Sequence, residues 1–200
     1  MTHYALLIDG QLQTAEHLDE VLDPATEQVV GYAARASEAQ VDAAVEAAQR
    51  AFAAWAADPQ ARRHALALAA AILRENSQQI AELISLEQGR PVRFTVGEVA
   101  GAAATFDHYA SFETPPAEVL RDDEQRLVRI ERRPLGVVAA ITPWNVPIIL
   151  LVLKLAPALH AGNTLVAKPS EHTPLSTLLL GHLLKDVFPA GVLNIVAGDG

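Results

Sequence analysis

The chain of 200 residues is acidic, half hydrophobic and free of cysteine. Its formal net charge of −9, from 15 Lys and Arg against 24 Asp and Glu, argues against nucleic acid as a partner, because phosphate binding needs a basic surface. The lack of cysteine excludes disulfides, thiolate metal sites and a cysteine nucleophile among these residues.

Neither a secretory leader nor a membrane span is indicated. The opening MTHYALLIDG lacks a basic start followed by an apolar run. The most apolar stretch, residues 146–159, is too short to span a bilayer and contains Lys154 and Pro157. We therefore expect a cytoplasmic protein with no membrane partner.

The N-terminus is predicted to form a small hairpin layer followed by helices. Residues 5–12 indicate two short strands around an Asp9-Gly10 turn, and residues 21–33 repeat the pattern. Ser37 and Gln40 have the spacing of a capping box, which predicts a helix beginning at Ser37. The same apolar periodicity predicts further helices from Pro59 to about Arg74, on to Gln88, and over residues 92–112.

After the Thr114-Pro115-Pro116 break, the pattern changes twice. Residues 125–133 alternate apolar and charged side chains, which is typical of a two-faced or edge strand. From Gly136, short apolar strands alternate with helices, which indicates an α/β fold with a parallel sheet covered on both faces. The predicted strands are 136–141, 164–168 and 192–198, and the predicted helices are 147–160 and 174–187.

Two polar, constrained segments follow the ends of two of these strands. Thr142 to Pro147 (TPWNVP) follows the first strand, and Lys168 to Glu171 (KPSE) follows the second. Because ligands of an open parallel sheet bind beyond the carboxyl ends of its strands, these segments are the main candidates for a site.

In the first segment, the prolines at 143 and 147 restrict the backbone on either side of Trp144 and Asn145, so the Asn145 carboxamide has little freedom. A rigid amide donor is what stabilisation of a developing oxyanion requires. The alternative is that Asn145 caps the helix starting at Pro147 while Trp144 only packs. Spacing alone leaves both interpretations open.

In the second segment, Lys168 can donate to hydroxyls or phosphate oxygens, and Glu171 can accept from both hydroxyls of a ribose. A carboxylate at that place would repel a 2′-phosphate, which favours NAD over NADP as the cofactor. The alternative is a turn at the end of a strand with solvated charges.

Three other features carry weaker signals. Gly198-Asp199-Gly200 follows another strand end, but the fuller GxGxxG fingerprint is absent. Lys154 lies on the same helical face as Pro147, where a side chain directed to solvent is the simpler explanation. The seven histidines lack the spacing of metal ligands, so no metal is expected.

Taken together, residues 136–147 (GVVAAITPWNVP), 154–164 (KLAPALHAGNT), 165–171 (LVAKPSE) and 188–200 (FPAGVLNIVAGDG) resemble the aldehyde dehydrogenase superfamily in order and spacing. The resemblance covers the whole chain and is specific after Gly136. It implies a Rossmann-like fold, NAD as the hydride acceptor, a small-molecule aldehyde as the substrate, and a homodimer or homotetramer.

The resemblance also implies roles for individual residues. Asn145 matches the oxyanion-hole asparagine of the family, and Lys154 matches a lysine proposed to take part in proton relay. Lys168 and Glu171 match the residues that bind ribose, and Gly200 matches a glycine near the adenine. The other positions placed in the cofactor site are Ile141, Thr142, Pro143, Trp144 and Ser170.

By the same resemblance, residues 1–113 and 135–200 form a cofactor-binding domain that is incomplete at its C-terminus, and residues 114–134 form a β arm for oligomerisation. The cysteine nucleophile, the general-base glutamate and the catalytic domain would lie beyond residue 200, so these residues alone are expected to be inactive. Two alternatives stay open: a non-catalytic nucleotide-binding or assembly fragment, and a CoA-acylating aldehyde dehydrogenase of the same fold.

Overall fold

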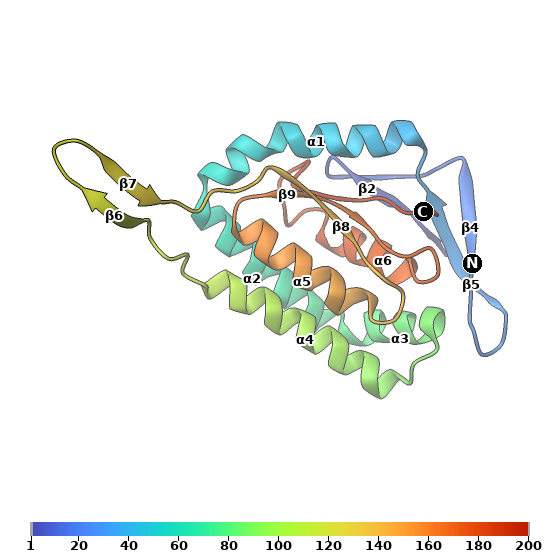
Figure 1. Ribbon diagram of the computed structural model, residues 1–200. Helices are drawn as coiled ribbons and strands as arrows, with labels where there is room; N and C mark the ends of the chain where they lie inside the picture. The colour runs from blue at the N-terminus through green and yellow to red at the C-terminus, as the bar shows by residue number, and fades with distance from the viewer. Residues whose placement is uncertain (1, 200) are drawn as a thin grey trace.

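The structure, a computed structural model that describes residues 2–199, is built around a mixed five-stranded sheet (Figure 1). Its strand order is β3-β2-β10-β9-β8. β8 (Val137–Ile141), β9 (Thr164–Lys168) and β10 (Leu193–Ile195) run parallel, as the alternation of apolar strands and helices predicted. The α/β fold class with a parallel sheet is thereby confirmed.

The N-terminal hairpin is part of this sheet. β2 (Leu6–Ile8) and β3 (Gln11–Gln13) pair through a turn in which Asp9 and Gly10 have positive φ values of 52° and 73°. β2 also pairs antiparallel with β10. All three residues of β2 are buried, so this strand needs cover on both of its faces. The predicted N-terminal hairpin is therefore present, and its strands extend the central sheet.

A second, three-stranded sheet lies beside the central one (Figure 1). β4 (His17–Leu22) and β5 (Val29–Arg35) pair antiparallel, and β1 (His3–Tyr4) pairs parallel with β5. The end of β5 is joined to the segment after β10, because Ala36 N donates to Ala197 O at 2.8 Å.

Helices cover both faces of the central sheet (Figure 1). α1 (Glu38–Ala57) packs on one face, and α5 (Pro147–His160) and α6 (Leu175–Leu184) pack on the other. α2 (Pro59–Glu75), α3 (Ser77–Gln88) and α4 (Val92–Ser111) form an outer layer. In that layer α2 and α4 contact α5, and α3 contacts α6.

Local capping groups set the ends of the early helices where the sequence predicted them. Ser37 Oγ accepts from Gln40 N at 3.3 Å and Gln40 Oε1 accepts from Ser37 N at 3.1 Å, which completes the capping box of α1. Asp58 caps α2 by accepting from Ala61 N at 2.9 Å. Gly89 ends α3 with a φ of 87°, a left-handed conformation that glycine adopts without strain.

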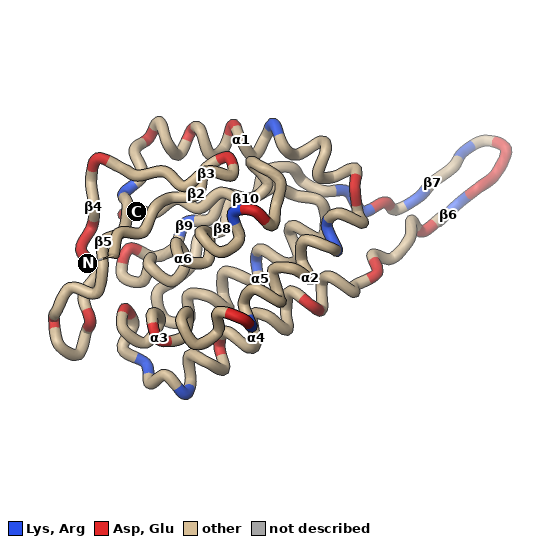
Figure 2. Tube along the Cα trace, turned by 180° about the vertical axis from the view of Figure 1, so that it is seen from behind, with Lys and Arg blue, Asp and Glu red and all other residues tan. Residues whose placement is uncertain are grey.

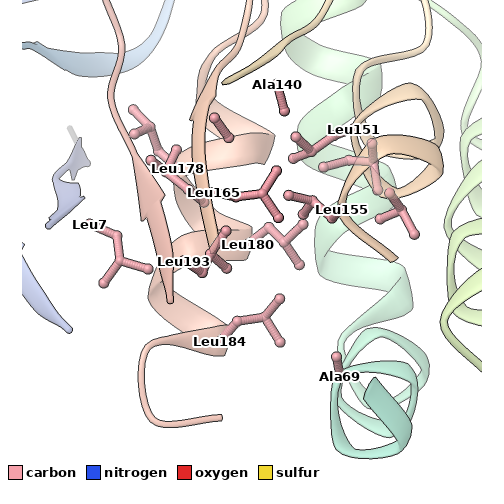
Figure 3. Close-up of a cluster of buried hydrophobic side chains, with 14 of the residues drawn as sticks. Leu7, Ala69, Ala140, Leu151, Leu155, Leu165, Leu178, Leu180, Leu184 and Leu193 are labelled. Carbon is pink, nitrogen blue, oxygen red and sulfur yellow. The ribbon is translucent and has the colours of Figure 1, made fainter. Parts of the chain in front are cut away.

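The apolar core fills the space between the central sheet and the layer of α5 and α6 (Figure 3). Leu165 of β9 and Leu193 of β10 lie with Leu151 and Leu155 of α5 and Leu178 of α6, and each of these side chains is at most 2% exposed. Full burial of one leucine stabilises a fold by about 1.5–3 kcal/mol. This packing holds the bodies of α5 and α6 against the sheet.

A two-stranded arm projects from this body (Figures 1 and 2). β6 (Glu118–Asp122) and β7 (Leu127–Ile130) pair antiparallel, and every residue of both strands is exposed. β7 lies within the strand predicted over residues 125–133. β6 falls in the β arm that the family resemblance implied over residues 114–134, although its residues, EVLRD, do not alternate between apolar and polar.

Charge is mixed over the molecule. Figure 2 shows Lys and Arg interspersed with Asp and Glu along the trace, and acidic residues at the tip of the arm, where the sequence has Asp122, Asp123 and Glu124. Within residues 2–199 no helix combines the length and the apolar character that a membrane span requires.

Candidate functional site

The two candidate segments leave the same rim of the central sheet side by side. β8 and β9 run parallel with Ile141 opposite Lys168, so both strands end at one level. Thr142 N donates to Lys168 O at 3.1 Å, which continues the pairing into the two turns. Further on, Thr173 Oγ1 donates to Trp144 O at 3.2 Å. The backbones of the two segments are thus bonded to each other.

Asn145 presents its carboxamide to solvent at this rim. The residue is exposed, and within residues 2–199 its side chain has no hydrogen-bond partner. The N-cap residue of α5 is Val146, and no side chain of the cap bonds to the helix. The interpretation of Asn145 as a helix cap is therefore wrong. Trp144 is 53% exposed, so packing does not account for it either.

The second segment forms a charged turn that is partly self-bonded. Lys168 Nζ donates to Pro169 O at 3.2 Å and lies 4.0 Å from Glu171 Oε2. The buried Ser170 hydroxyl donates to Glu171 Oε2 at 3.3 Å and accepts from His172 N at the same distance. The Glu171 carboxyl is exposed, and its pKa lies below the usual value, chiefly because it accepts from its own backbone N–H. Glu171 is therefore a carboxylate at neutral pH.

An apolar cleft of about 520 Å³ lies over the face of β8 and β9 next to this rim. Ile141 and Val166 from the strands, Val41 from α1 and the segment 196–199 line it, with Lys168 as a cation at its edge. Apolar walls with a few polar groups are the usual composition of a small-molecule site. Gly200, predicted to lie near the adenine, is outside the described residues.

Lys154 lies apart from the two turns. It is exposed, and its Nζ donates to Leu150 O on the same helix at 3.3 Å. α5 starts at Pro147, so at 1.5 Å per residue Lys154 is about 10 Å farther along the helix axis. The described residues show no hydrogen bond between Lys154 and Asn145. Its part in proton relay stays a prediction.

The sequence analysis missed two buried glutamates, each of which caps a helix that follows a candidate turn. Glu98 of α4 accepts from Ile148 N at the start of α5. Glu87 of α3 accepts from Leu175 N at 2.7 Å and from Ser176 N at 3.0 Å at the start of α6. Each bond joins residues 50 or more positions apart in the sequence, so no local sequence motif indicates it.

Glu87 is also unusual in its protonation. Its burial raises the pKa of the carboxyl to about 7, against the opposing effect of the hydrogen bonds from Ser176 and Leu175, and the nearby Glu98 raises it further. Glu87 lines a cavity of about 620 Å³ together with Trp144 and Glu171. The Glu87 carboxyl, close to the candidate site, therefore changes its protonation state near neutral pH.

Two polar turns at the carboxyl rim of a sheet covered by helices on both faces are the usual place of a ligand site in an α/β domain. A model of the aldehyde dehydrogenase family matches residues 12–200. The chain is 39% identical, over its whole length, to the 3,6-anhydro-alpha-L-galactose dehydrogenase of Vibrio sp. (strain EJY3), and covers 43% of that protein. It is 37% identical, over 98% of its length, to the NADP/NAD-dependent aldehyde dehydrogenase PuuC of Escherichia coli (strain K12), and covers 41% of that protein.

A solved structure agrees with these relatives. The NAD+ complex of an aldehyde dehydrogenase from Bacillus cereus superposes with a TM-score of 0.93 at 31% identity, over all of this chain and 42% of that one. The chain therefore belongs to the aldehyde dehydrogenase family. It spans less than half the length of these relatives and corresponds to their N-terminal portion, as the resemblance implied.

The raised pKa of Glu87 predicts a dependence of stability on pH. Between the ordinary carboxyl pKa of 4.5 and about 7, the folded protein holds a proton that the unfolded chain has lost. The free energy of unfolding therefore falls as pH rises through this range, by up to about 3 kcal/mol from this group. Glu87→Gln, which carries no titratable proton, should flatten the fall when urea unfolding of the complete protein is measured from pH 5 to 8.

A matched control is Glu82→Gln, which changes an exposed glutamate on the same helix. It should leave the pH dependence of the unmodified protein in place. Parallel pH curves for the unmodified protein and Glu87→Gln would contradict the raised pKa.

Proposed function

We propose that this chain is the cofactor-binding part of an enzyme that oxidises an aldehyde to a carboxylic acid with NAD as the hydride acceptor. The observation that carries the proposal is the exposed, unbonded Asn145 carboxamide, joined through Trp144 O and Thr173 to the turn that holds Lys168 and Glu171. Membership of the aldehyde dehydrogenase family supports it.

The chemistry assigned to Asn145 is the stabilisation of an oxyanion. In the proposed reaction a cysteine thiolate outside these residues attacks the aldehyde carbon, and the carbonyl oxygen gains negative charge. The Asn145 Nδ2 donates to that oxygen. Since the carboxamide has no other partner within residues 2–199, the bond forms without breaking an existing one. When a hydride leaves that carbon for the acceptor, the oxyanion re-forms a carbonyl and a thioester results. A glutamate outside these residues then activates the water that hydrolyses the thioester and releases the thiolate.

The residues at the rim suit a nicotinamide dinucleotide, which when bound accepts the hydride. Lys168 can donate to a ribose hydroxyl or a phosphate oxygen, and the ionised Glu171 can accept from two ribose hydroxyls. Ser170 supports the Glu171 carboxylate, and the cleft lined by Ile141 offers an apolar wall to a ring. Thr142, Pro143 and Trp144 supply the backbone on the other side, and Gly200 is proposed near the adenine.

The charge on Glu171 leads us to propose NAD over NADP. A 2′-phosphate would meet a carboxylate at the place where a 2′-hydroxyl would donate to it. The Escherichia coli relative is an NADP/NAD-dependent aldehyde dehydrogenase, so we base the proposed preference on Glu171 and not on family membership.

We also propose that residues 114–134 form an arm that pairs with another copy, giving a homodimer or homotetramer. The arm exposes Val119, Leu120, Leu127 and Ile130, each by 45% or more. A two-stranded ribbon is only marginally stable in water unless it packs against something else.

We further propose that residues 1–113 and 135–200 make up the cofactor-binding domain and that the catalytic domain lies outside these residues. The complete protein is proposed to be cytoplasmic.

Asn145→Ala tests the oxyanion role. In the complete protein the substitution should lower kcat at least tenfold, because removal of one oxyanion donor costs about 10²–10³ in rate in a well-studied case. The far-ultraviolet circular dichroism should not change. Gln49→Ala, which removes an exposed carboxamide from α1, is the control and should leave kcat unchanged. Unchanged turnover in Asn145→Ala would refute the role.

Glu171→Thr tests the cofactor preference. Replacing the carboxylate with a hydroxyl removes the repulsion of a 2′-phosphate, so the ratio of kcat/KM with NADP to kcat/KM with NAD should rise, by about tenfold if about 1.4 kcal/mol of repulsion is lost. Glu46→Thr, at an exposed position of α1 beside the N-terminal ends of β9 and β10, should leave the ratio unchanged. If NADP use does not rise relative to NAD, the assignment of the ribose contact is wrong.

A further inference from the structure

The helix that follows Asn145 lacks a capping group of its own. The N-cap residue of α5 is Val146, and its side chain cannot accept a hydrogen bond. Pro147 at the first helical position has no N–H, so the first donors that need partners are those of Ile148 and Ile149. Ile148 is fully buried, and its N–H needs an acceptor from the protein itself.

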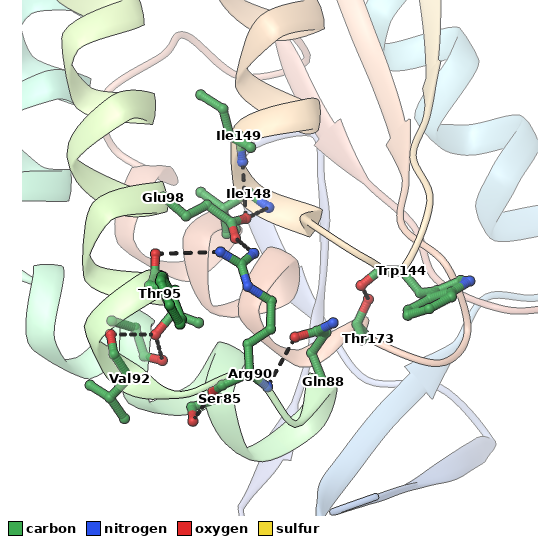
Figure 4. Close-up of polar contacts among 12 residues, drawn as sticks. Ser85, Gln88, Arg90, Val92, Thr95, Glu98, Trp144, Ile148, Ile149 and Thr173 are labelled. Carbon is green, nitrogen blue, oxygen red and sulfur yellow. Dashed lines mark hydrogen bonds and ion pairs between the residues drawn. The ribbon is translucent and has the colours of Figure 1, made fainter.

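Glu98 of α4 supplies that acceptor (Figure 4). Its Oε1 accepts from Ile148 N at 2.9 Å and from Ile149 N at 3.3 Å. The Glu98 side chain is only 2% exposed, so water does not compete for these bonds. A carboxylate at this place also faces the positive end of the helix dipole, which adds to the attraction.

The carboxylate is held from its other side by Arg90 (Figure 4). Arg90 Nη1 lies 2.7 Å from Glu98 Oε2. The backbone of Arg90 is fixed in turn, because its N–H donates to Gln88 Oε1 at 3.1 Å and its carbonyl accepts from Ser85 Oγ. Glu98 is therefore a rigid anchor and not a side chain that follows the movements of α5.

Asn145 lies between this anchor and a second one. On one side Trp144 O accepts from Thr173 Oγ1 at 3.2 Å, and on the other Ile148 N donates to Glu98. Only Asn145, Val146 and Pro147 lie between the bonded groups. Since the Asn145 side chain has no bond of its own within residues 2–199, its direction depends on the backbone that these two anchors hold.

We propose that Glu98, fixed by Arg90, is a positioning residue that aims the Asn145 carboxamide at the reacting oxygen. The inference rests on the proposed function, in which Asn145 donates to the oxyanion. Without the anchor the start of α5 is free to shift, and a displacement of about 1 Å at a reacting group is enough to cost about 100-fold in rate.

A double-mutant cycle in the complete protein tests this, with hexanal as the probe aldehyde and NAD at saturation. Glu98→Ala should lower kcat at least about tenfold with the KM for NAD within about twofold, because the loss is confined to the transition state. Glu98→Gln keeps an oxygen that accepts from Ile148 N but loses the ion pair with Arg90, so its kcat should fall between those of the unmodified protein and Glu98→Ala. In the Asn145→Ala background, Glu98→Ala should change kcat less than about twofold, because the group it positions is gone.

Two further measurements separate positioning from a general loss of stability. Amide hydrogen exchange at Ile148 and Ile149 should accelerate in Glu98→Ala in both backgrounds, which reports the lost anchor without reference to activity. Leu73→Ala removes a buried side chain of α2 and should lower the thermal midpoint while kcat stays within about twofold. If Glu98→Ala does not fold, Glu98→Asp, which withdraws the carboxylate by one methylene, takes its place in the cycle.

The outcomes are distinct. Equal loss of kcat on changing Glu98 in both backgrounds, or no loss with Asn145 present, would overturn the positioning role and leave the oxyanion role intact. Full activity in Asn145→Ala alone would overturn the proposed function, and the positioning role with it.

Discussion

The parallel pairing of β8 with β9 is the constraint from which the rest of the site follows. With Ile141 opposite Lys168, the two strands end together, and the bond from Thr142 N to Lys168 O carries the pairing past their ends. Consecutive residues of β9 are buried between α1 on one face and α5 on the other, so the packing of Leu165 and its neighbours holds the strand in place. Hydrophobic packing in this way determines which polar groups meet at the rim.

The outer helices α3 and α4 do more than cover α5 and α6. Each carries one buried glutamate across to the first turn of a helix in the next layer, and those helices begin directly after the two turns. An unpaired buried N–H costs about 1–3 kcal/mol, so these bonds make the start of α5 and α6 well defined. Strand register places the turns along the rim, and the glutamates place the helices that leave them.

Much of the fold could be predicted from the sequence because its signals are local. A few neighbouring residues are enough to predict the capping box at Ser37, the left-handed Gly89 and the apolar strands after Gly136. The two turns could be predicted to share a rim, because parallel strands present their carboxyl ends together.

What could not be predicted depends on long-range contacts. Glu87 and Glu98 look like ordinary polar positions on amphipathic helices until the partner helices are in place. The addition of β2 to the central sheet depends on β10, almost the whole chain away, and nothing in residues 5–12 indicates that partner. The same limit explains why Asn145 was an ambiguous cap from spacing alone: its competitor for the helix start, Glu98, is on another element.

The central claim is that the two bonded turns at the rim of β8 and β9 bind one nicotinamide dinucleotide between them. A crystal structure of the complete protein with NAD tests it most directly. We expect a ribose whose hydroxyls contact Lys168 and Glu171, with the nicotinamide end directed toward Asn145. A dinucleotide bound at another edge of the sheet, or in contact with neither turn, would contradict it.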